Sequence, residues 1–224
     1  MVEPSVEFST VAFVDLAGFT ALTEMHGDLE AADLADRFAS ITRSVLTTGD
    51  RLVKTIGDAV LVVSADADSG LRVVQRLIER SYADPRFPDV RAGLHHGPVV
   101  RRNGDVFGAT VNLAARIAGR AASGQVLATG VVAERAAAIL VTDLGQVQLR
   151  NIDESVRLFE LDFGLRPDVV VDPVCRMLVR TSAATIRLQM RGTEFLFCGL
   201  DCAAKFAGAP DRYAGAPQGA CQRA

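Results

Sequence analysis

The sequence has almost no lysine, no excess of positive charge and no long apolar run. Its net charge of −3 and pI near 5.6 give no electrostatic reason for binding nucleic acid or an anionic membrane. No apolar run approaches the roughly 20 residues that a membrane-spanning helix needs. The acidic start, MVEPSVEFST, lacks the basic and apolar regions of a signal peptide. We therefore expect a cytoplasmic protein without nucleic-acid or membrane partners.

Cysteine is missing from the first three quarters of the chain. The cysteines all lie in the last quarter, at Cys175, Cys198, Cys202 and Cys221. In a reducing compartment, such a cluster favours metal binding or redox chemistry over structural disulfides. A residue usage rich in alanine and arginine but poor in lysine is typical of bacteria with GC-rich genomes.

The stretch Arg51–Val63 carries the strongest local signal in the chain. Two short β-branched runs flank Gly57-Asp58, a dipeptide typical of a tight β-hairpin. The hairpin includes Lys54, one of only two lysines among the 24 basic residues. A lysine kept in so arginine-rich a chain indicates a position that needs a compact ammonium group. An exposed turn with a solubilising lysine is the alternative interpretation.

Hydrophobic periodicity and turn residues predict strands and helices in a mixed order. Strands are expected at Phe8–Val14, Val90–His95 and Val99–Arg101, with a turn at Gly97-Pro98. Helices are expected at Leu29–Thr47, Ala67–Tyr82 and Gly108–Ala118. This order predicts an α+β fold, in which a mostly antiparallel sheet is covered by helices on one face.

A change of composition around Phe163 indicates a domain boundary. Pro167 and Val169–Val171 are predicted to belong to a linker, after which Asp172-Pro173 opens a cysteine-bearing segment. We expect a large domain at 1–165, a linker at 166–171, a small module at 172–213 and a flexible tail at 214–224.

Two aspartates are placed where they can hold metal ions. Asp15 follows a buried strand, and Asp58 lies at the tip of the hairpin. Two such carboxylates can hold two divalent ions over a polyphosphate. The amides of Gly18–Thr20 open the next helix, where phosphate oxygens are favoured. An ordinary turn explains each feature taken alone, so the prediction depends on the whole set.

A predicted helix carries a second polar pair. Asn112 and Arg116 are four residues apart and therefore share one helix face. An amide and a guanidinium on one face suit a ribose contact and a charge developing on phosphorus. A solvated helix face is the alternative. We expect His95 and His96 to be structural and His26 to be a surface residue.

Together these segments resemble a known family. FVDLAGFT, LVKTIGDAVLVV, GLHHGPVV and GDVFGATVNLAARI resemble the catalytic domain of class III nucleotide cyclases over about Val6–Phe163. The resemblance implies a ferredoxin-like domain that converts ATP to 3′,5′-cyclic AMP and pyrophosphate. It implies two Mg²⁺ or Mn²⁺ ions held by Asp15, the backbone carbonyl of Leu16 and Asp58. In that family each active site lies between two subunits, so a homodimer is implied.

The resemblance also implies roles for the other polar residues. The implied substrate-binding residues are Lys54, Asp105, Gly18, Phe19 and Thr20. Lys54 and Asp105 would recognise adenine, since guanine-specific relatives carry other residues there. Asn112 would orient the ribose and Arg116 would stabilise the transition state. Pro98 stands where some adenylyl cyclases have a phosphate-binding arginine.

The last quarter of the chain resembles a YHS domain, a small metal-associated module. The matching segments are DPVCRM, with Cys175, and FLFCGLDCAAKF, with Cys198, Cys202 and Phe206. About 45 residues bury too little apolar surface to fold alone, so a metal or docking to a larger domain is expected. Three thiolates favour Zn²⁺ or Cu⁺. The residues that name the family are not all kept, which leaves the fourth ligand open, and we expect Cys221 to be a free thiol.

Three functions remain open from the sequence. The first is an adenylate cyclase whose turnover responds to metal binding in the cysteine module. The second is an inactive cyclase-like protein that senses a nucleotide or a metal. The third is a metal chaperone in which the larger domain only dimerises. The complete set of implied site residues favours the enzyme.

Overall fold

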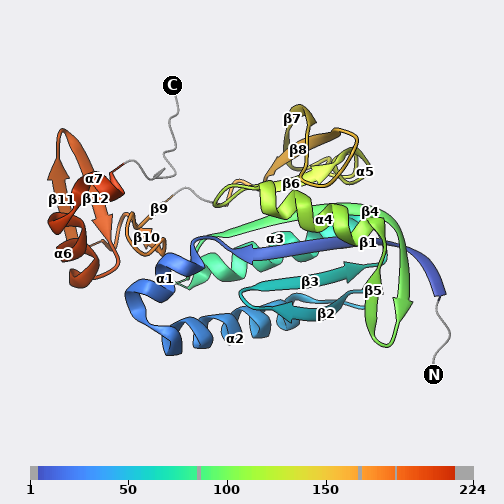
Figure 1. The fold of residues 1–224 in the computed structure, drawn as a ribbon, viewed down its shortest axis with the longest axis horizontal. Helices are drawn as coiled ribbons and strands as arrows, with labels where there is room; N and C mark the ends of the chain where they lie inside the picture. Colours follow the sequence, from blue (N-terminus) through green and yellow to red (C-terminus); the bar gives the residue numbers. More distant parts are fainter. Residues whose placement is uncertain (1–4, 85–86, 166–167, 185, 215–224) are drawn as a thin grey trace.

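The computed structural model describes residues 5–84, 87–165, 168–184 and 186–214 (Figure 1). Its main sheet has eight strands in the order β2-β3-β1-β4-β6-β8-β7, with β5 paired to β4. Strands β4 and β6 are parallel, and the other neighbours are antiparallel. The strands are β1 Ser5–Leu16, β2 Arg51–Ile56, β3 Ala59–Ser64, β4 Val90–Arg102, β5 Asp105–Phe107, β6 Val126–Thr129, β7 Leu140–Val147 and β8 Val156–Asp162. The predicted α+β class is confirmed.

The helices of this part are α1 Phe19–His26, α2 Asp28–Val45, α3 Ala67–Ala83, α4 Ala109–Arg120 and the short α5 Gly130–Ala133. Three of them, α2, α3 and α4, form at the three ranges where the sequence predicts helices, and α1 and α5 are additional to these ranges. Leu34 and Phe38 of α2 and Val74 of α3 are buried, as their helical spacing predicts. The hairpin of β2 and β3 turns at Gly57, whose positive φ of 61° suits glycine.

Helices lie on both faces of the sheet, not on one face as the sequence predicted. On β1, side chains alternate between the faces. A Cβ on Gly70 of α3 would lie 2.6 Å from Thr10, so α3 packs against the face that Thr10 occupies. A Cβ on Gly93 of β4 would lie 2.1 Å from the backbone of Ala118, so α4 packs on that side. Gly93 pairs with Phe13, which points away from Thr10.

Strand β4 runs unbroken through Gly97-Pro98, so the predicted turn there is wrong. Gly97 pairs with Ser9 and Pro98 with Phe8. A Cβ at Gly97 would lie 2.6 Å from the hydroxyl oxygen of Thr110. The same hydroxyl donates a 2.7 Å hydrogen bond to the carbonyl of Pro98. Glycine is therefore needed for the close approach of α4, and no chain reversal is involved.

The cysteine-bearing module adds two small hairpins and two helices. Its elements are β9 Val169–Val171, β10 Leu178–Arg180, β11 Ile186–Met190, β12 Thr193–Phe197, α6 Leu200–Gly208 and α7 Pro210–Tyr213. Val169–Val171, expected as linker, is instead a strand paired with β10. Pro167, most of the expected tail and Cys221 lie outside the described residues.

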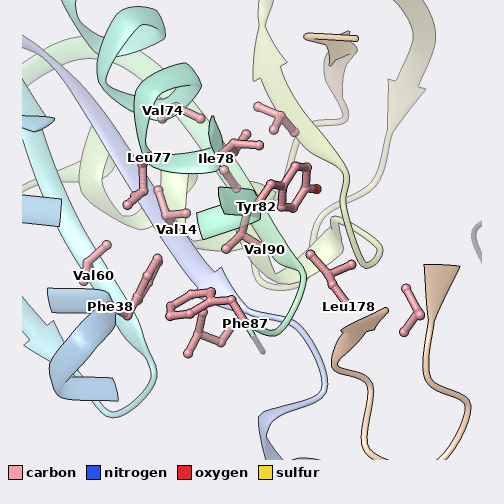
Figure 2. Close-up of a cluster of buried hydrophobic side chains, with 14 of the residues drawn as sticks. Val14, Phe38, Val60, Val74, Leu77, Ile78, Tyr82, Phe87, Val90 and Leu178 are labelled. Atoms are coloured by element: carbon pink, nitrogen blue, oxygen red, sulfur yellow. The ribbon is translucent and has the colours of Figure 1, made fainter. Parts of the chain in front are cut away.

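The module shares one hydrophobic core with the main sheet. Met177 forms a β-bridge with Pro88, and the amide of Leu178 donates to the carbonyl of Phe87 at 3.1 Å. Figure 2 shows Leu178 in the same cluster as Phe87 and Val90. The guanidinium of Arg180 donates to the carbonyl of Tyr82 at 2.8 Å. The module is therefore packed against the loop between α3 and β4.

Within the described residues, no helix is long and apolar enough to cross a membrane.

Candidate active site and cysteine cluster

The structure brings Asp15 and Asp58 together. Asp15, near the end of β1, pairs in register with Ala59, the first residue after the hairpin turn. The amide of Leu16 donates to the carbonyl of Asp58 at 3.3 Å, which ties the hairpin tip to β1. Burial and the nearby charge of Asp15 raise the pKa of Asp58 to about 6. Two carboxylates held this close favour a cation between them.

Arg91 provides a cation for this pair, and the sequence did not single it out. It stands opposite Asp15 on β4, and its Nε donates to the carboxylate of Asp15 at 2.7 Å. Its positive charge also lowers the pKa of Asp58, against the larger effects of burial and Asp15. Arg91 therefore partly neutralises the carboxylate pair.

The turn after β1 opens α1. Gly18 has a φ of 80°, a left-handed conformation that favours glycine, and it stands at the N-cap of α1. The amide of Ala17 donates to the carbonyl of Asp89 at 2.7 Å, which fixes the turn. Thr20 is exposed, whereas the Phe19 ring packs against the core. Phe19 therefore anchors the helix start and leaves the backbone amides of the turn as the groups that can meet phosphate.

Lys54 and Asp105 form an ion pair of 2.6 Å between strands β2 and β5. The hydrogen bond from Lys54 is the main cause that lowers the pKa of Asp105 below its ordinary value. Lys54 pairs in register with Leu61, and Leu61 with Phe13. Lys54 therefore points to the same sheet face as Asp15.

Asn112 and Arg116 are both exposed on α4, on the side away from the buried Ala114. Helix α4 covers the sheet face to which Asp15 and Lys54 point. Asp15, Lys54 and the helix that carries Asn112 and Arg116 therefore lie on one side of the sheet. Within one chain, the carboxylate pair Asp15–Asp58 and the ion pair Lys54–Asp105 form two separate groups.

The two neighbouring histidines have hydrogen-bonded partners in the sheet. The Nδ1 atom of His95 lies 2.8 Å from the hydroxyl of Thr129. The Nδ1 atom of His96 lies 2.9 Å from the hydroxyl of Thr10. Burial lowers the pKa of His95. These contacts fit a structural role for both residues.

The module's cysteines meet at one point. The sulfurs of Cys175 and Cys198 are 3.4 Å apart, and those of Cys198 and Cys202 are 3.6 Å apart. All three thiols are free. Hydrogen bonds from Cys175 and Cys198 lower the pKa of Cys202 to about 5. The cluster therefore favours one thiolate even without a cation.

His26 joins this cluster, and its prediction as a surface residue is wrong. One nitrogen of His26 and the three sulfurs all lie within 4.8 Å of one another. The Nε2 atom is buried although the residue as a whole is only partly covered. His26 is the last residue of α1, and the sulfurs come from the module. Packing of the module against α1 covers the ring.

Asp172 organises the backbone around the sulfurs. Its carboxylate is fully buried and accepts from the amides of Val174 at 2.8 Å and Cys198 at 2.8 Å. It also accepts from the amide of Cys175 at 3.3 Å. One side chain therefore sets the positions of two sulfur-bearing residues that are far apart in sequence.

Arg176 connects the module to the turn after β1. A Cβ on Gly18 would lie 2.4 Å from the Cγ atom of Arg176, so this side chain covers the turn. Arg176 itself has a φ of 68°, and burial lowers the pKa of its guanidinium. The module thus touches the segment that is predicted to meet substrate phosphates.

Structural comparison identifies the fold as a class III cyclase catalytic domain. The adenylyl cyclase CyaB from P. aeruginosa superposes with a TM-score of 0.62 at 20% identity, covering 71% of this chain and 96% of that chain. At this identity the match establishes the fold alone.

The chain belongs to the family of the adenylate and guanylate cyclase catalytic domain, whose family model matches residues 1–161. A YHS domain matches residues 170–217. The pH-sensitive adenylate cyclase MT1302 of Mycobacterium tuberculosis is 39% identical over 167 residues, which are 72% of this chain and 42% of that protein. An adenylate cyclase of Streptomyces coelicolor is 39% identical over 125 residues, 55% of this chain and 33% of that protein. The chain thus spans less than half the length of these relatives.

Proposed function

We propose that this protein is an adenylate cyclase that converts ATP to 3′,5′-cyclic AMP and pyrophosphate. The observation that carries the proposal is the Asp15–Asp58 pair, in which the end of β1 meets the tip of the hairpin, in a chain of the cyclase family. Relatives named adenylate cyclase at about 39% identity support ATP as the substrate.

The carboxylates of Asp15 and Asp58 and the carbonyl of Leu16 would hold two Mg²⁺ or Mn²⁺ ions. The donor set fits, because all three ligands are oxygens, which both cations prefer. When bound, such ions would supply charge neutralisation of the triphosphate and activation of the ribose 3′ hydroxyl. Arg91 must then share Asp15 with the ions or move away from it.

The remaining residues would bind and orient the nucleotide. Lys54 would donate to a ring nitrogen of adenine, and Asp105 would accept from its exocyclic amine. Asn112 would fix the ribose so that its 3′ oxygen faces the α-phosphorus. The 3′ hydroxyl would release its proton to solvent and its oxygen would form a bond to the α-phosphorus, while the bond from the α-phosphorus to the bridging oxygen breaks and pyrophosphate leaves with that oxygen. Arg116 would stabilise the negative charge that grows on phosphorus in this step.

We propose that each active site is shared between two copies of the chain. Support comes from apolar side chains beside the base-recognition pair. Ile56, on the strand of Lys54, is 49% exposed, and Phe107, on the strand of Asp105, is 50% exposed. Large apolar residues on such strands suit burial against a partner. The exposed Asn112 and Arg116 would then complete the partner's carboxylate site.

Complementation tests this sharing. Asp58→Ala and Lys54→Ala proteins, each inactive alone, should regain activity when mixed, because one of the two hybrid sites keeps both wild-type halves. The expected recovery is about a quarter of the wild-type rate at equal mixing, since half the dimers are mixed and each has one intact site. No recovery, despite demonstrated subunit exchange, would exclude shared sites.

We also propose that the cysteine module binds Zn²⁺ or Cu⁺ through Cys175, Cys198 and Cys202 and that this binding changes cyclase turnover. The contact of Arg176 with the Gly18 turn supports a route from the module to the active site. An inactive nucleotide or metal sensor is the second candidate function, because the cysteine cluster offers metal ligands whether or not the chain turns over ATP. The complete set of polar site residues favours the enzyme.

The deciding experiment measures cyclic AMP formed from ATP with Mn²⁺ or Mg²⁺. Asp58→Asn keeps the shape of the side chain and removes its charge, so activity should fall at least 100-fold, about 2.7 kcal/mol of transition-state stabilisation. Asp143→Asn is the matched control, because Asp143 pairs with Arg157 on the far hairpin of β7 and β8. No turnover by the wild-type protein would support the sensor. Equal loss in both variants would indicate a fold defect.

A further inference from the structure

We propose that His26 is the fourth ligand of a Cys₃His zinc site that joins the cyclase domain to the cysteine module. The ligands would be the three sulfurs of Cys175, Cys198 and Cys202 and one ring nitrogen of His26. Neither the cyclase family match nor the YHS family match covers both halves of this set, because His26 lies in the first and the cysteines lie in the second.

The spacing of the sulfurs fits a tetrahedral ion. Sulfurs bound to zinc at about 2.3 Å lie about 3.8 Å apart when the angles are tetrahedral. The measured separations of 3.4 Å for Cys175 and Cys198 and 3.6 Å for Cys198 and Cys202 need only a small expansion. All three thiols are free in this structure, so each sulfur is available as a ligand.

The histidine supplies a donor that the described protein does not otherwise use. The Nε2 atom of His26 is buried, and it has no hydrogen-bond partner among the residues that the structure describes. A buried polar atom without a partner costs about 1–3 kcal/mol. Coordination of a metal removes this cost, because the lone pair of a neutral imidazole is a good zinc ligand.

The identity of the cation follows from the donor set. Three thiolates and one imidazole form a closed, four-coordinate set of the kind found in structural zinc sites. Asp172, which accepts from the amides of Cys175 and Cys198, fixes the backbone of two ligands in the way that outer-shell partners of zinc sites do. The site therefore points to a structural ion that holds parts of the protein together.

The parts that the ion would hold together are far apart in the sequence. His26 ends α1, the helix that begins directly after the turn at Gly18. Cys175 follows β9, Cys198 follows β12, and Cys202 lies in the first turn of α6. The full ligand set therefore exists only while the module is docked on α1. Zinc would bind more tightly to the docked protein, which offers four ligands, than to the undocked protein, which offers three. The difference between these two binding free energies would stabilise the docked arrangement.

This inference goes beyond the proposed cyclase activity and does not depend on it. The metal would fix the last residue of α1 from one side, while Arg176 covers Gly18 before its first residue. Both ends of one eight-residue helix are then held by the module. Metal removal should loosen α1 and the Gly18 turn together.

The test uses full-length protein, kept reduced, with Zn²⁺ and Co²⁺ as the probes. Zinc affinity is measured by competition with a chromogenic chelator. His26→Gln should weaken zinc binding at least about tenfold, because one of four ligands is lost. Glu24→Gln is the matched control, since Glu24 is an exposed residue of the same helix, and its affinity should not change. Unchanged affinity in His26→Gln would overturn the proposal.

A second variant keeps the test decisive if His26→Gln folds poorly. His26→Cys offers a fourth thiolate at the same place, so it should still bind zinc. In the Co²⁺ form, its sulfur-to-metal charge-transfer absorption should rise to about 4/3 of the wild-type value. Hydrogen exchange of α1 should slow on zinc addition in wild type and His26→Cys, but not in His26→Gln. A charge-transfer band of wild-type strength in His26→Cys would place residue 26 outside the coordination sphere and refute the proposed Cys₃His site.

Discussion

The raised pKa of Asp58 predicts that divalent-metal binding weakens steeply below neutral pH. Burial and the charge of Asp15 bring this pKa to about 6, from an ordinary value of 3.8. The carboxylate must be deprotonated to hold Mn²⁺, so protons and metal compete for it. The facing charges are Asp15, which raises the pKa, and Arg91, which lowers it. Affinity should therefore rise with pH through about 6 and level off above it.

The size of the effect follows from the fraction of Asp58 that is charged. With a pKa of about 6, roughly a tenth is deprotonated at pH 5 and roughly nine tenths at pH 7. The apparent association constant for Mn²⁺ should then be about tenfold larger at pH 7 than at pH 5. With an ordinary pKa of 3.8, the two values would differ by less than about 10%.

The assay is a Mn²⁺ titration followed by electron paramagnetic resonance, without nucleotide and with the cysteine site already filled with zinc. Asp58→Asn should bind Mn²⁺ weakly and without this pH dependence. The difference between wild type and variant isolates the site from other carboxylates. A change of less than twofold between pH 5 and pH 7 in the wild type would refute the reasoning.

Three further perturbations follow from single contacts. Arg91→Gln removes the charge that lowers the pKa of Asp58, so the acid limb of the Mn²⁺-binding profile should move to higher pH; a shift to lower pH would contradict this role. Gly18→Ala adds a Cβ 2.4 Å from Arg176 at a φ of +80°. Its strain of about 1–2 kcal/mol should lower Tm by about 2–8 °C in calorimetry, and an unchanged Tm would show that the contact is loose. Asp172→Ala should weaken zinc affinity about 10–100-fold in chelator competition, whereas wild-type affinity would show that the three amides need no acceptor.

Local features of the chain could be predicted because their causes are local. The hairpin is specified by its own Gly57-Asp58 turn, and helices α2 and α3 are specified by the spacing of their own apolar residues. The approach of Asp15 to Asp58 depends on the pairing of β1 with β3, and it was expected from the resemblance to the cyclase family.

Features that depend on tertiary packing were missed. Gly97-Pro98 has the composition of a turn, but the glycine makes room for Thr110 of α4 in the middle of a strand. The pairing of Arg91 with Asp15 depends on the register between β1 and β4. His26 gave no signal near its own position, because its cysteine neighbours follow in the last quarter of the chain.

The shared core also has a consequence for folding during synthesis. Domains fold as they leave the ribosome, with the N-terminal one first. The cyclase sheet would form before Leu178 and the rest of the module have been synthesised, so the apolar residues that the module covers would still face water. The residues from Val169 to Tyr213 take roughly 2 to 9 s to add at about 5–20 residues per second. During that interval the newly made cyclase domain exposes an apolar patch. The module buries this patch only after it has been synthesised and has docked.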